Sequence, residues 1–276
     1  MTGVLVLANE TIGGAKLLDV IRERHAEGDV RFHVVVPQSR PRHGNVIYTE
    51  AVRDSAQVRV DLALAFMREE GIEGSGEVGD ADPFSAATDA VGAGGIDEII
   101  VSTLPQPSSG WLRRDLVERL EEATGLPVRH VVVDLDSEGL PFDVTLVIAN
   151  QTMAGTELVD HLKQLAEEGP RRIIAVVPQD GGDGSAVQAA RARLGRLLDS
   201  LTEAGIVAAG MIGDPDPYTA AMNAVQYFHI SEVVVSTLPS NRSQWLEKGL
   251  VDKLVRDTGK PVGHVESSTE PAGAEA

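Results

Sequence analysis

Short apolar runs alternate with longer stretches of helical periodicity along this chain. In the first half the runs are rich in Val and Ile, and they predict five strands over 4–8, 32–36, 75–78, 99–101 and 128–133. Apolar residues that recur every three or four positions predict the helices between them, over 15–26, 52–70, from 83 onward and over 111–122. Strands that are apolar on both faces and joined by helical crossovers predict a doubly wound parallel sheet of the α/β class.

The same series of elements occurs twice. The segment Leu5–Thr11 recurs as Leu146–Thr152, 141 residues later, and Gly79–Pro83 recurs as Gly213–Pro217, 134 residues later. The difference between the two offsets, 141 − 134 = 7 residues, is extra length in the first copy, and we place it in 39–48. The chain is therefore an internal duplication, with one α/β domain in each half.

The duplication sets the expected domain boundaries. We expect one domain over 1–138, a second over 142–266, and a disordered tail over 267–276, which has little to bury. The acidic segment 134–143 is the predicted linker. When extended, its ten residues would span roughly 33 Å.

The most closely repeated stretch is Glu98–Leu112 in the first half and Glu232–Leu246 in the second. Each copy is predicted to be a strand that stops at Ser-Thr-Leu-Pro, because proline removes a donor from the sheet and favours an extended leucine before it. A polar loop follows, and then a helix opens near Trp111 or Trp245. Proteins of the α/β class bind ligands at such carboxyl ends of strands.

Each half resembles a universal stress protein domain. The resemblance rests on a first strand that ends in a short polar turn, a Gly-Asp-x-x-Pro turn such as Gly213–Pro217, and a last strand that opens with Pro-Val. It implies a tandem universal stress protein: two five-stranded sheets of strand order 3-2-1-4-5, each with a ligand crevice between strands 1 and 4. It also implies an intramolecular pseudo-dimer through the edge strands 128–133 and 262–265, and it allows a further homodimer.

The chain departs from this family at the nucleotide-binding motif. The resemblance implies an aspartate at the end of strand 1 in ATP-binding members, where this chain has Asn9 and Asn150. Those members also carry glycines after strand 4, which let backbone N–H groups close around phosphates. Here Pro105 and Pro239 stand in that loop and have no N–H to donate. ATP or AMP is therefore a candidate cofactor without its usual loop, and we expect no metal.

The candidate nucleotide-binding residues lie at the strand ends and in the loops that follow them. They are Asn9, Thr11, Gly14, Pro37, Arg40, Arg42, Ser102, Thr103, Leu104 and Ser109 in the first half, and Asn150, Thr152, Gly155, Pro178, Ser236, Thr237 and Ser243 in the second. Hydroxyls near a helix N-terminus suit a phosphate or carboxylate. The same Asn, Thr and Ser side chains also stabilise turns and cap helices, so the sequence leaves both readings open. Arg40 and Arg42 have no counterpart in the second half, which favours a site in the first.

Two further pairs of residues are equivalent by the repeat. Trp111 and Trp245 are interpreted as apolar anchors of the last helix, with stacking on a base as the alternative. His130 and His264 fall in the fifth strand with no other histidine at metal-ligand spacing, and we interpret both as structural or interfacial.

Composition narrows the class of protein. The absence of cysteine excludes disulfides and thiolate chemistry. A formal net charge of −18 argues against nucleic acid and anionic membranes as partners, and leaves a small-molecule anion or nucleotide as the expected one. No apolar run approaches the roughly 20 residues that cross a bilayer, and the N-terminal residues are predicted to be a strand rather than a signal peptide. We expect a cytoplasmic protein.

Three functions fit these features. The first is a non-catalytic stress-response module that binds a small phosphate-bearing ligand, such as an adenine nucleotide, in the crevice between strands 1 and 4. The second is a ligand-free interaction or scaffold protein of the same family. The third is a nucleotide phosphohydrolase or transferase, which ranks last because the sequence offers no nucleophile with a general base and no clustered carboxylates.

Overall fold

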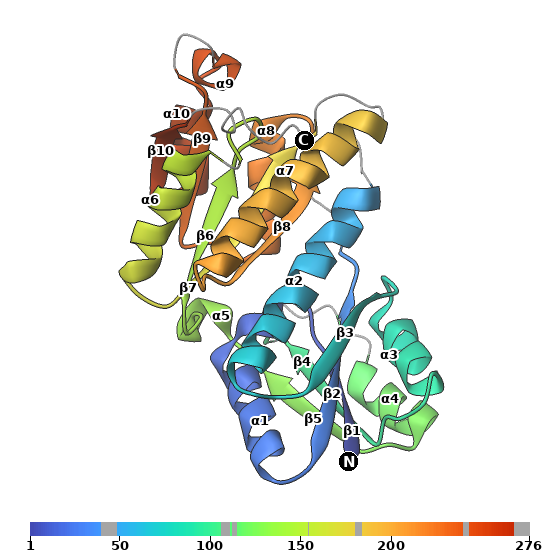
Figure 1. The fold of residues 1–276 in the computed structure, drawn as a ribbon. Helices are drawn as coiled ribbons and strands as arrows, with labels where there is room; N and C mark the ends of the chain where they lie inside the picture. The colour runs from blue at the N-terminus through green and yellow to red at the C-terminus, as the bar shows by residue number, and fades with distance from the viewer. Residues whose placement is uncertain are drawn as a thin grey trace. The chain divides into compact units, whose positions relative to one another are not determined.

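The chain forms two compact units, residues 1–39 with 55–141 and residues 40–54 with 142–276. Figure 1 shows the computed structural model, in which each unit contains one five-stranded parallel sheet. The predicted α/β class and the internal duplication are therefore confirmed. The structure describes residues 1–39, 49–105, 111, 115–153, 155–179, 184–239 and 243–267.

The sheet of the first unit has strand order β3-β2-β1-β4-β5, as predicted. Its strands are β1 (Thr2–Leu7), β2 (Val30–Pro37), β3 (Gly74–Gly79), β4 (Glu98–Thr103) and β5 (Val128–Val132). A 3-10 helix, η1 (Glu10–Gly13), follows β1. The α-helices are α1 (Ala15–Ala26), α2 (Thr49–Glu69), α3 (Pro83–Gly92), α4 (Leu116–Thr124) and the single turn α5 (Leu135–Glu138).

The sheet of the second unit repeats this order as β10-β9-β6-β7-β8. Its strands are β6 (Asp143–Ile148), β7 (Arg171–Pro178), β8 (Ala208–Gly213), β9 (Glu232–Thr237) and β10 (Val262–Glu266). Its helices are α6 (Thr156–Glu167), α7 (Gly184–Glu203), α8 (Pro217–Tyr227), α9 (Gln244–Glu247) and α10 (Leu250–Thr258). All neighbouring strands in both sheets run parallel, so their carboxyl ends share one edge.

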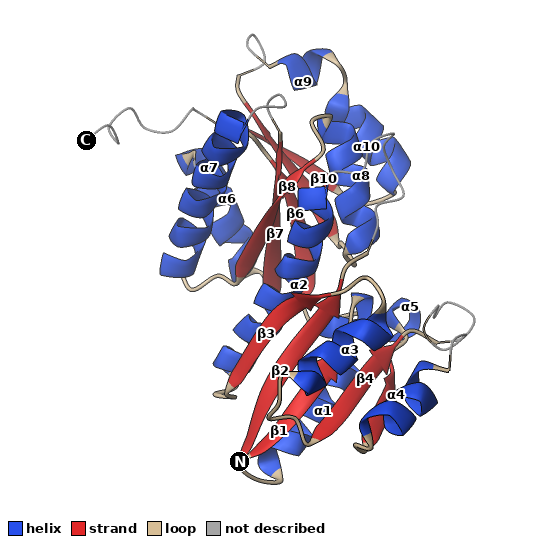
Figure 2. Ribbon diagram, turned by 90° about the vertical axis from the view of Figure 1, so that its right-hand side faces the viewer, coloured by secondary structure: helices blue, strands red, loops and turns tan. Residues whose placement is uncertain are grey.

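Helices cover both faces of each sheet (Figure 2). In the first unit, Leu5 and Leu7 of β1 pack with Leu116 and Leu120 of α4 in one buried cluster. In the second unit, a cluster on the other face of the sheet joins β6 and β7 to α6 and α7. Because successive strand side chains point to opposite faces, the continuous apolar runs in the sequence supply both layers.

The helix caps follow the sequence closely. Asp82 accepts a hydrogen bond from Ser85 N at 3.1 Å, and proline occupies the first position of α3. Asp216 does the same at 2.9 Å for α8. Gly125, at φ 67°, ends α4 in the left-handed region that favours glycine.

The last helix of each half begins later than the sequence predicts. We expected it to open at Trp111, but α4 begins at Leu116, and in the second half α10 begins at Leu250. Asp115 at φ 48° and its repeat counterpart Gly249 at φ 65° stand just before these helices. A left-handed residue cannot continue an α-helix, so it separates the tryptophan segment from the helix that follows.

The predicted linker is partly folded. Its residues 135–138 form α5, and Asp134 caps this turn by accepting from Ser137 N at 3.3 Å. Hydrogen bonds from Ser137 lower the pKa of the Asp134 carboxyl. Leu135 is buried, and Glu138 pairs with Lys16 of α1. The segment up to Glu138 therefore packs on the first unit, and the reach of a fully extended linker does not apply to it.

The second unit extends past its last strand. Ser267, which we assigned to the disordered tail, is buried, and its Oγ donates to Glu157 Oε2 of α6 at 2.9 Å. Its backbone N–H also donates to Thr237 O at 2.9 Å. Ser267 is thus part of the fold, and the remainder of the predicted tail, 268–276, lies outside the described residues.

Candidate functional site

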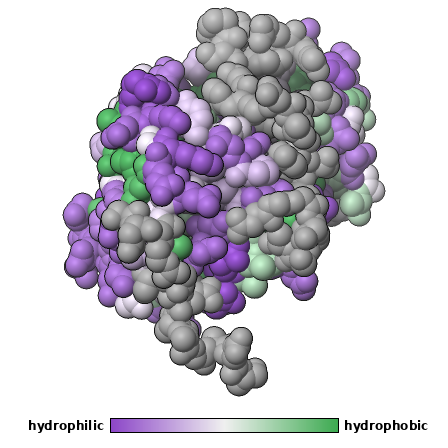
Figure 3. All heavy atoms as spheres, turned by 90° about the horizontal axis from the view of Figure 1, so that it is seen from above, coloured by the Kyte–Doolittle hydropathy of each residue, from purple (hydrophilic) through white to green (hydrophobic). Residues whose placement is uncertain are grey.

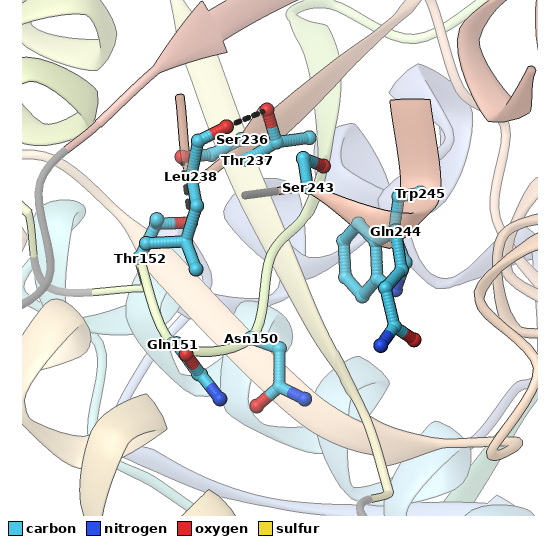
Figure 4. A pocket seen from close by; sticks show the side chains of 9 residues that line it. All are labelled: Asn150, Gln151, Thr152, Ser236, Thr237, Leu238, Ser243, Gln244 and Trp245. Carbon is cyan, nitrogen blue, oxygen red and sulfur yellow. Dashed lines mark hydrogen bonds between the residues drawn. The ribbon is translucent and has the colours of Figure 1, made fainter. Parts of the chain in front are cut away.

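A cavity of about 250 Å³ opens at the carboxyl ends of β6 and β9. These neighbouring strands flank the point where the winding of the sheet reverses, which is where ligands bind in open α/β sheets. Figure 4 shows the nine residues that line the cavity, which come from the turn after β6, the end of β9 and the start of α9. They are Asn150, Gln151, Thr152, Ser236, Thr237, Leu238, Ser243, Gln244 and Trp245.

Two buried hydroxyls join the strand ends beside this cavity. Ser236 Oγ at the end of β9 donates to Thr152 Oγ1 in the turn after β6, at 2.9 Å. Both side chains are almost fully inaccessible to solvent. This bond holds the turn against β9, and it satisfies two polar groups that water does not reach.

A histidine in the edge strand fixes the next residue of β9. Thr237 Oγ1 donates to Leu238 O at 2.8 Å, so its contact with His264 Nε2 at 2.9 Å requires the imidazole N–H to be the donor. The first half repeats this pair, with 2.9 Å between Thr103 Oγ1 and His130 Nε2. Burial lowers the pKa of His130, an effect that Glu118 partly opposes. The histidines thus orient the threonines that end β4 and β9.

Sequence reasoning missed one residue beside the cavity. Arg193 of α7 donates from Nη2 to Asn150 Oδ1 at 2.6 Å, a short, charge-assisted hydrogen bond. It fixes the Asn150 side chain on the cavity wall and brings a positive charge next to a lining that has no charged residue.

The repeat itself contained the signal for this arginine. At the offset of 134 residues, Arg59 of α2 is the counterpart of Arg193. The alignment holds in space: a Cβ built on Gly76 would lie 2.8 Å from Val60, and one built on Gly210 would lie 2.5 Å from Leu194. An arginine retained in both copies of that helix was readable from the sequence, but only after the offset was extended through α2.

The tryptophans occupy different surroundings, although the repeat makes them equivalent. Trp111 is half-buried and packs against the core cluster of the first unit. Trp245 is also half-buried, but it lies on α9, which has no buried residue, and it lines the cavity. Ser243 caps this short helix by accepting from Leu246 N at 3.4 Å. The anchoring role therefore fits Trp111, and contact with a ligand fits Trp245.

This difference gives a paired prediction. Trp111→Ala should lower the free energy of unfolding by about 1–3 kcal/mol, less than for a fully buried ring. Trp245→Ala should cost under about 1 kcal/mol because its ring packs on a cavity rather than a core. Urea unfolding of the two variants measures both effects. Equal losses of stability would show that the two rings are equivalent anchors after all.

The remaining candidates in the first half fall into three groups. Asn9 donates from Nδ2 to Pro37 O at 3.3 Å and to Ser39 Oγ at 2.7 Å, while Leu104 is half-buried just after β4. Thr11 and Ser102 are buried at the strand ends. Outside the described residues lie Arg40, Arg42 and Ser109.

The glycine and proline candidates shape the crevice rather than present polar side chains to it. Gly14 and Gly155 precede α1 and α6 with nearly the same backbone, φ −68° in both. A Cβ on Gly14 would lie 2.2 Å from Val133 Cγ1, so the close approach requires glycine. Pro37 and Pro178 are the last residues of β2 and β7.

The surface around the site agrees with the acidic composition. Seen from above, the described part of the surface is mostly hydrophilic (Figure 3). In the described ranges, no three His, Asp or Glu side chains are placed to hold a metal ion. Over those same ranges, none of the helices has both the length and the apolar character needed to cross a membrane.

Comparison with known proteins adds one structural likeness. No family model matches the chain, and no curated protein matches it. Among solved structures, it is similar to a crystal structure from Archaeoglobus fulgidus DSM 4304, with 14% sequence identity, 96% of each chain covered and a TM-score of 0.34. That structure is of a universal stress protein. The match to this universal stress protein runs through both halves of the chain.

Proposed function

We propose that the chain is a tandem universal-stress-protein-like module that binds a small phosphate-bearing ligand without turning it over. The observation that carries the proposal is the cavity between the turn after β6 and the end of β9. It lies at the switch point of the sheet, and it is lined by candidates chosen from the sequence, among them Asn150, Thr152 and Ser236.

The chemistry of the lining suits a phosphate joined to a flat ring. Ser243 and Thr237 present hydroxyl groups at the cavity, and Arg193 brings a positive charge to its wall through Asn150. The Trp245 ring lines the same cavity and offers a surface for stacking a base. An adenine nucleotide supplies both the phosphate and the base.

Size and charge favour AMP over ATP. The cavity, at about 250 Å³, is at the lower end of ligand sites, which commonly measure about 300–1,000 Å³. Each added phosphate also increases repulsion from a protein of net charge −18. Without glycines after β9, the backbone cannot wrap a triphosphate closely.

The lining also supports a binding role rather than a catalytic one. All nine lining residues are amides, hydroxyl residues, a leucine or a tryptophan. General acid–base catalysis needs a group that titrates near neutral pH within reach of the reacting atoms. No lining residue supplies one.

The proposal includes the intramolecular pseudo-dimer and a cytoplasmic location. β5 and β10 are outermost strands, and each has a single neighbour in its own sheet. Their free edges suit pairing between the halves, which would cover backbone groups that otherwise favour aggregation. Both points stay predictions.

Calorimetric titration of the full chain with AMP tests the ligand assignment. We expect Thr237→Val to weaken AMP binding about tenfold through the loss of one hydrogen-bonding hydroxyl. Thr103→Val is the matched control, because Thr103 makes the same contact with a histidine in the first half. ATP should bind more weakly than AMP.

Two results would contradict this assignment. If Thr103→Val weakens binding and Thr237→Val does not, the site lies in the first half, where Arg40 and Arg42 pointed in the sequence. If AMP does not bind at all, the ligand-free scaffold function replaces this one.

A further inference from the structure

The switch point of the first unit differs from that of the second in one respect. Asn9, Thr11 and Ser102 occupy there, by the repeat, the positions that three cavity-lining residues occupy in the second unit. η1, which contains Thr11, packs against β4, which contains Ser102. The three side chains therefore converge on one crevice, at the carboxyl ends of β1 and β4.

In the second unit, this set of polar groups is closed internally. Thr152 and Ser236 bond to each other at 2.9 Å, and Asn150 Oδ1 accepts from Arg193 at 2.6 Å. Each of these side chains has a partner from the protein itself. The cavity next to them is thus preformed and needs no ligand to satisfy its wall.

In the first unit, the same groups stay open. Thr11 Oγ1, Ser102 Oγ and Asn9 Oδ1 are buried atoms that find no hydrogen-bond partner among the described residues. Thr11 is 2% exposed and Ser102 is 1% exposed, so bulk water does not hydrate their hydroxyls. Buried polar groups in folded proteins are nearly always paired, so a cluster of three unpaired ones indicates a missing partner.

The geometry also restricts what that partner is. The amide nitrogen of Asn9 is already used, because it donates to Pro37 O and Ser39 Oγ. Its Oδ1 therefore needs a donor, which a deprotonated phosphate or carboxylate is not. The hydroxyls of Thr11 and Ser102 both donate and accept. A hydroxyl group meets all three requirements, and a neutral one avoids repulsion from the net charge of −18.

We propose that Asn9, Thr11 and Ser102 form a binding site in the first unit for the hydroxyl groups of a neutral polyhydroxylated compound. An ordered water offers the same chemistry, and the experiment below separates the two sources. The site is independent of the phosphate site proposed in the second unit, because it uses other residues and a ligand of different charge.

The test uses the full chain with D-ribose as the probe, followed by thermal unfolding and NMR titration. We expect D-ribose to raise the melting temperature of the wild type. Thr11→Val and Ser102→Ala should each weaken its binding about tenfold, through the loss of one hydrogen bond. The matched controls Thr152→Val and Ser236→Ala should leave its binding unchanged.

The same variants give a second readout without any ligand. Replacing an unpaired buried hydroxyl by an apolar group should keep or raise the melting temperature, whereas breaking the Thr152–Ser236 bond should lower it. This contrast shows whether Thr11 and Ser102 are open in the free protein.

Three outcomes would overturn the proposal. One is a wild type that does not respond to D-ribose, which would leave a bound water as the only partner. Another is equal weakening of D-ribose binding by the variants of both halves. The third is a loss of melting temperature in Thr11→Val and Ser102→Ala as large as in the controls, since those hydroxyls would then already be paired.

Discussion

Gly3→Ala should lower the free energy of unfolding by about 3 kcal/mol or more. Gly3 lies in β1, and a Cβ built on it would stand 1.7 Å from Gly95 O and 3.2 Å from Ile96 Cα. Both obstacles are backbone atoms, so no rotation of a side chain relieves the overlap. The loop is also tied to this position, since Gly3 N donates to Asp97 Oδ2 and Asp97 N donates to Gly3 O, both at 2.8 Å.

Gly28→Ala is the matched control for this effect. A Cβ on Gly28 meets nothing within 4 Å, so the substitution should be neutral or raise stability by about 0.4–1 kcal/mol. Calorimetry of both variants makes the comparison. The second half carries Val144 at the position of Gly3, which shows that the glycine is required by the first-half loop and not by the strand. A Gly3→Ala variant as stable as Gly28→Ala would mean that this loop does not approach β1 as described.

Leu120→Ala and Leu254→Ala should each cost about 2–5 kcal/mol. The two leucines are repeat counterparts in α4 and α10, and both are fully buried. Leu120 belongs to the core cluster of the first unit, and α10 packs on α8 and β10 of the second. Truncation removes the buried methyl groups and leaves a cavity, which adds to the cost.

Chemical unfolding of the two leucine variants, followed by circular dichroism, measures these losses. Val255→Ala is the control on the same helix, because Val255 is half exposed and should cost well under 1 kcal/mol. Two equal, large losses would agree with two cores of one design. A loss at Leu254 no larger than at Val255 would show that α10 does not close a core.

The sequence predicted the fold well because its signals were local and occurred twice. The helix over 15–26 was predicted with the bounds that α1 has, and Asp82 caps α3 as its position before proline indicated. Strand order came from the resemblance to a family, and the structure bears it out in both sheets. The carboxyl ends of strands 1 and 4 were therefore the right place to look for a site.

Details set by backbone geometry or by distant contacts were harder to predict. Nothing in the residue type of Asp115 announces its positive φ, which delays the start of α4. The turn α5 forms because Leu135 is buried and Glu138 meets Lys16, a partner 122 residues away. Arg193 reaches Asn150 from a different helix, so no single motif contains both.

The repeat also concealed a difference between the halves. Identical residue types predict identical crevices, yet Ser236 and Thr152 bond to each other while Ser102 and Thr11 do not. Tenths of an ångström in the approach of a turn to a strand decide whether such a bond forms. A sequence pattern does not carry information at that scale.

The fluorescence of single-tryptophan variants tests the central claim most directly. The chain has two tryptophans, one in each half, and only Trp245 lines the described cavity. In Trp111→Phe the remaining indole lies at the proposed phosphate site, and in Trp245→Phe it packs on the first core. We predict that AMP changes the emission of Trp111→Phe and leaves that of Trp245→Phe unchanged. A response confined to Trp245→Phe, or no response in either variant, would contradict the account.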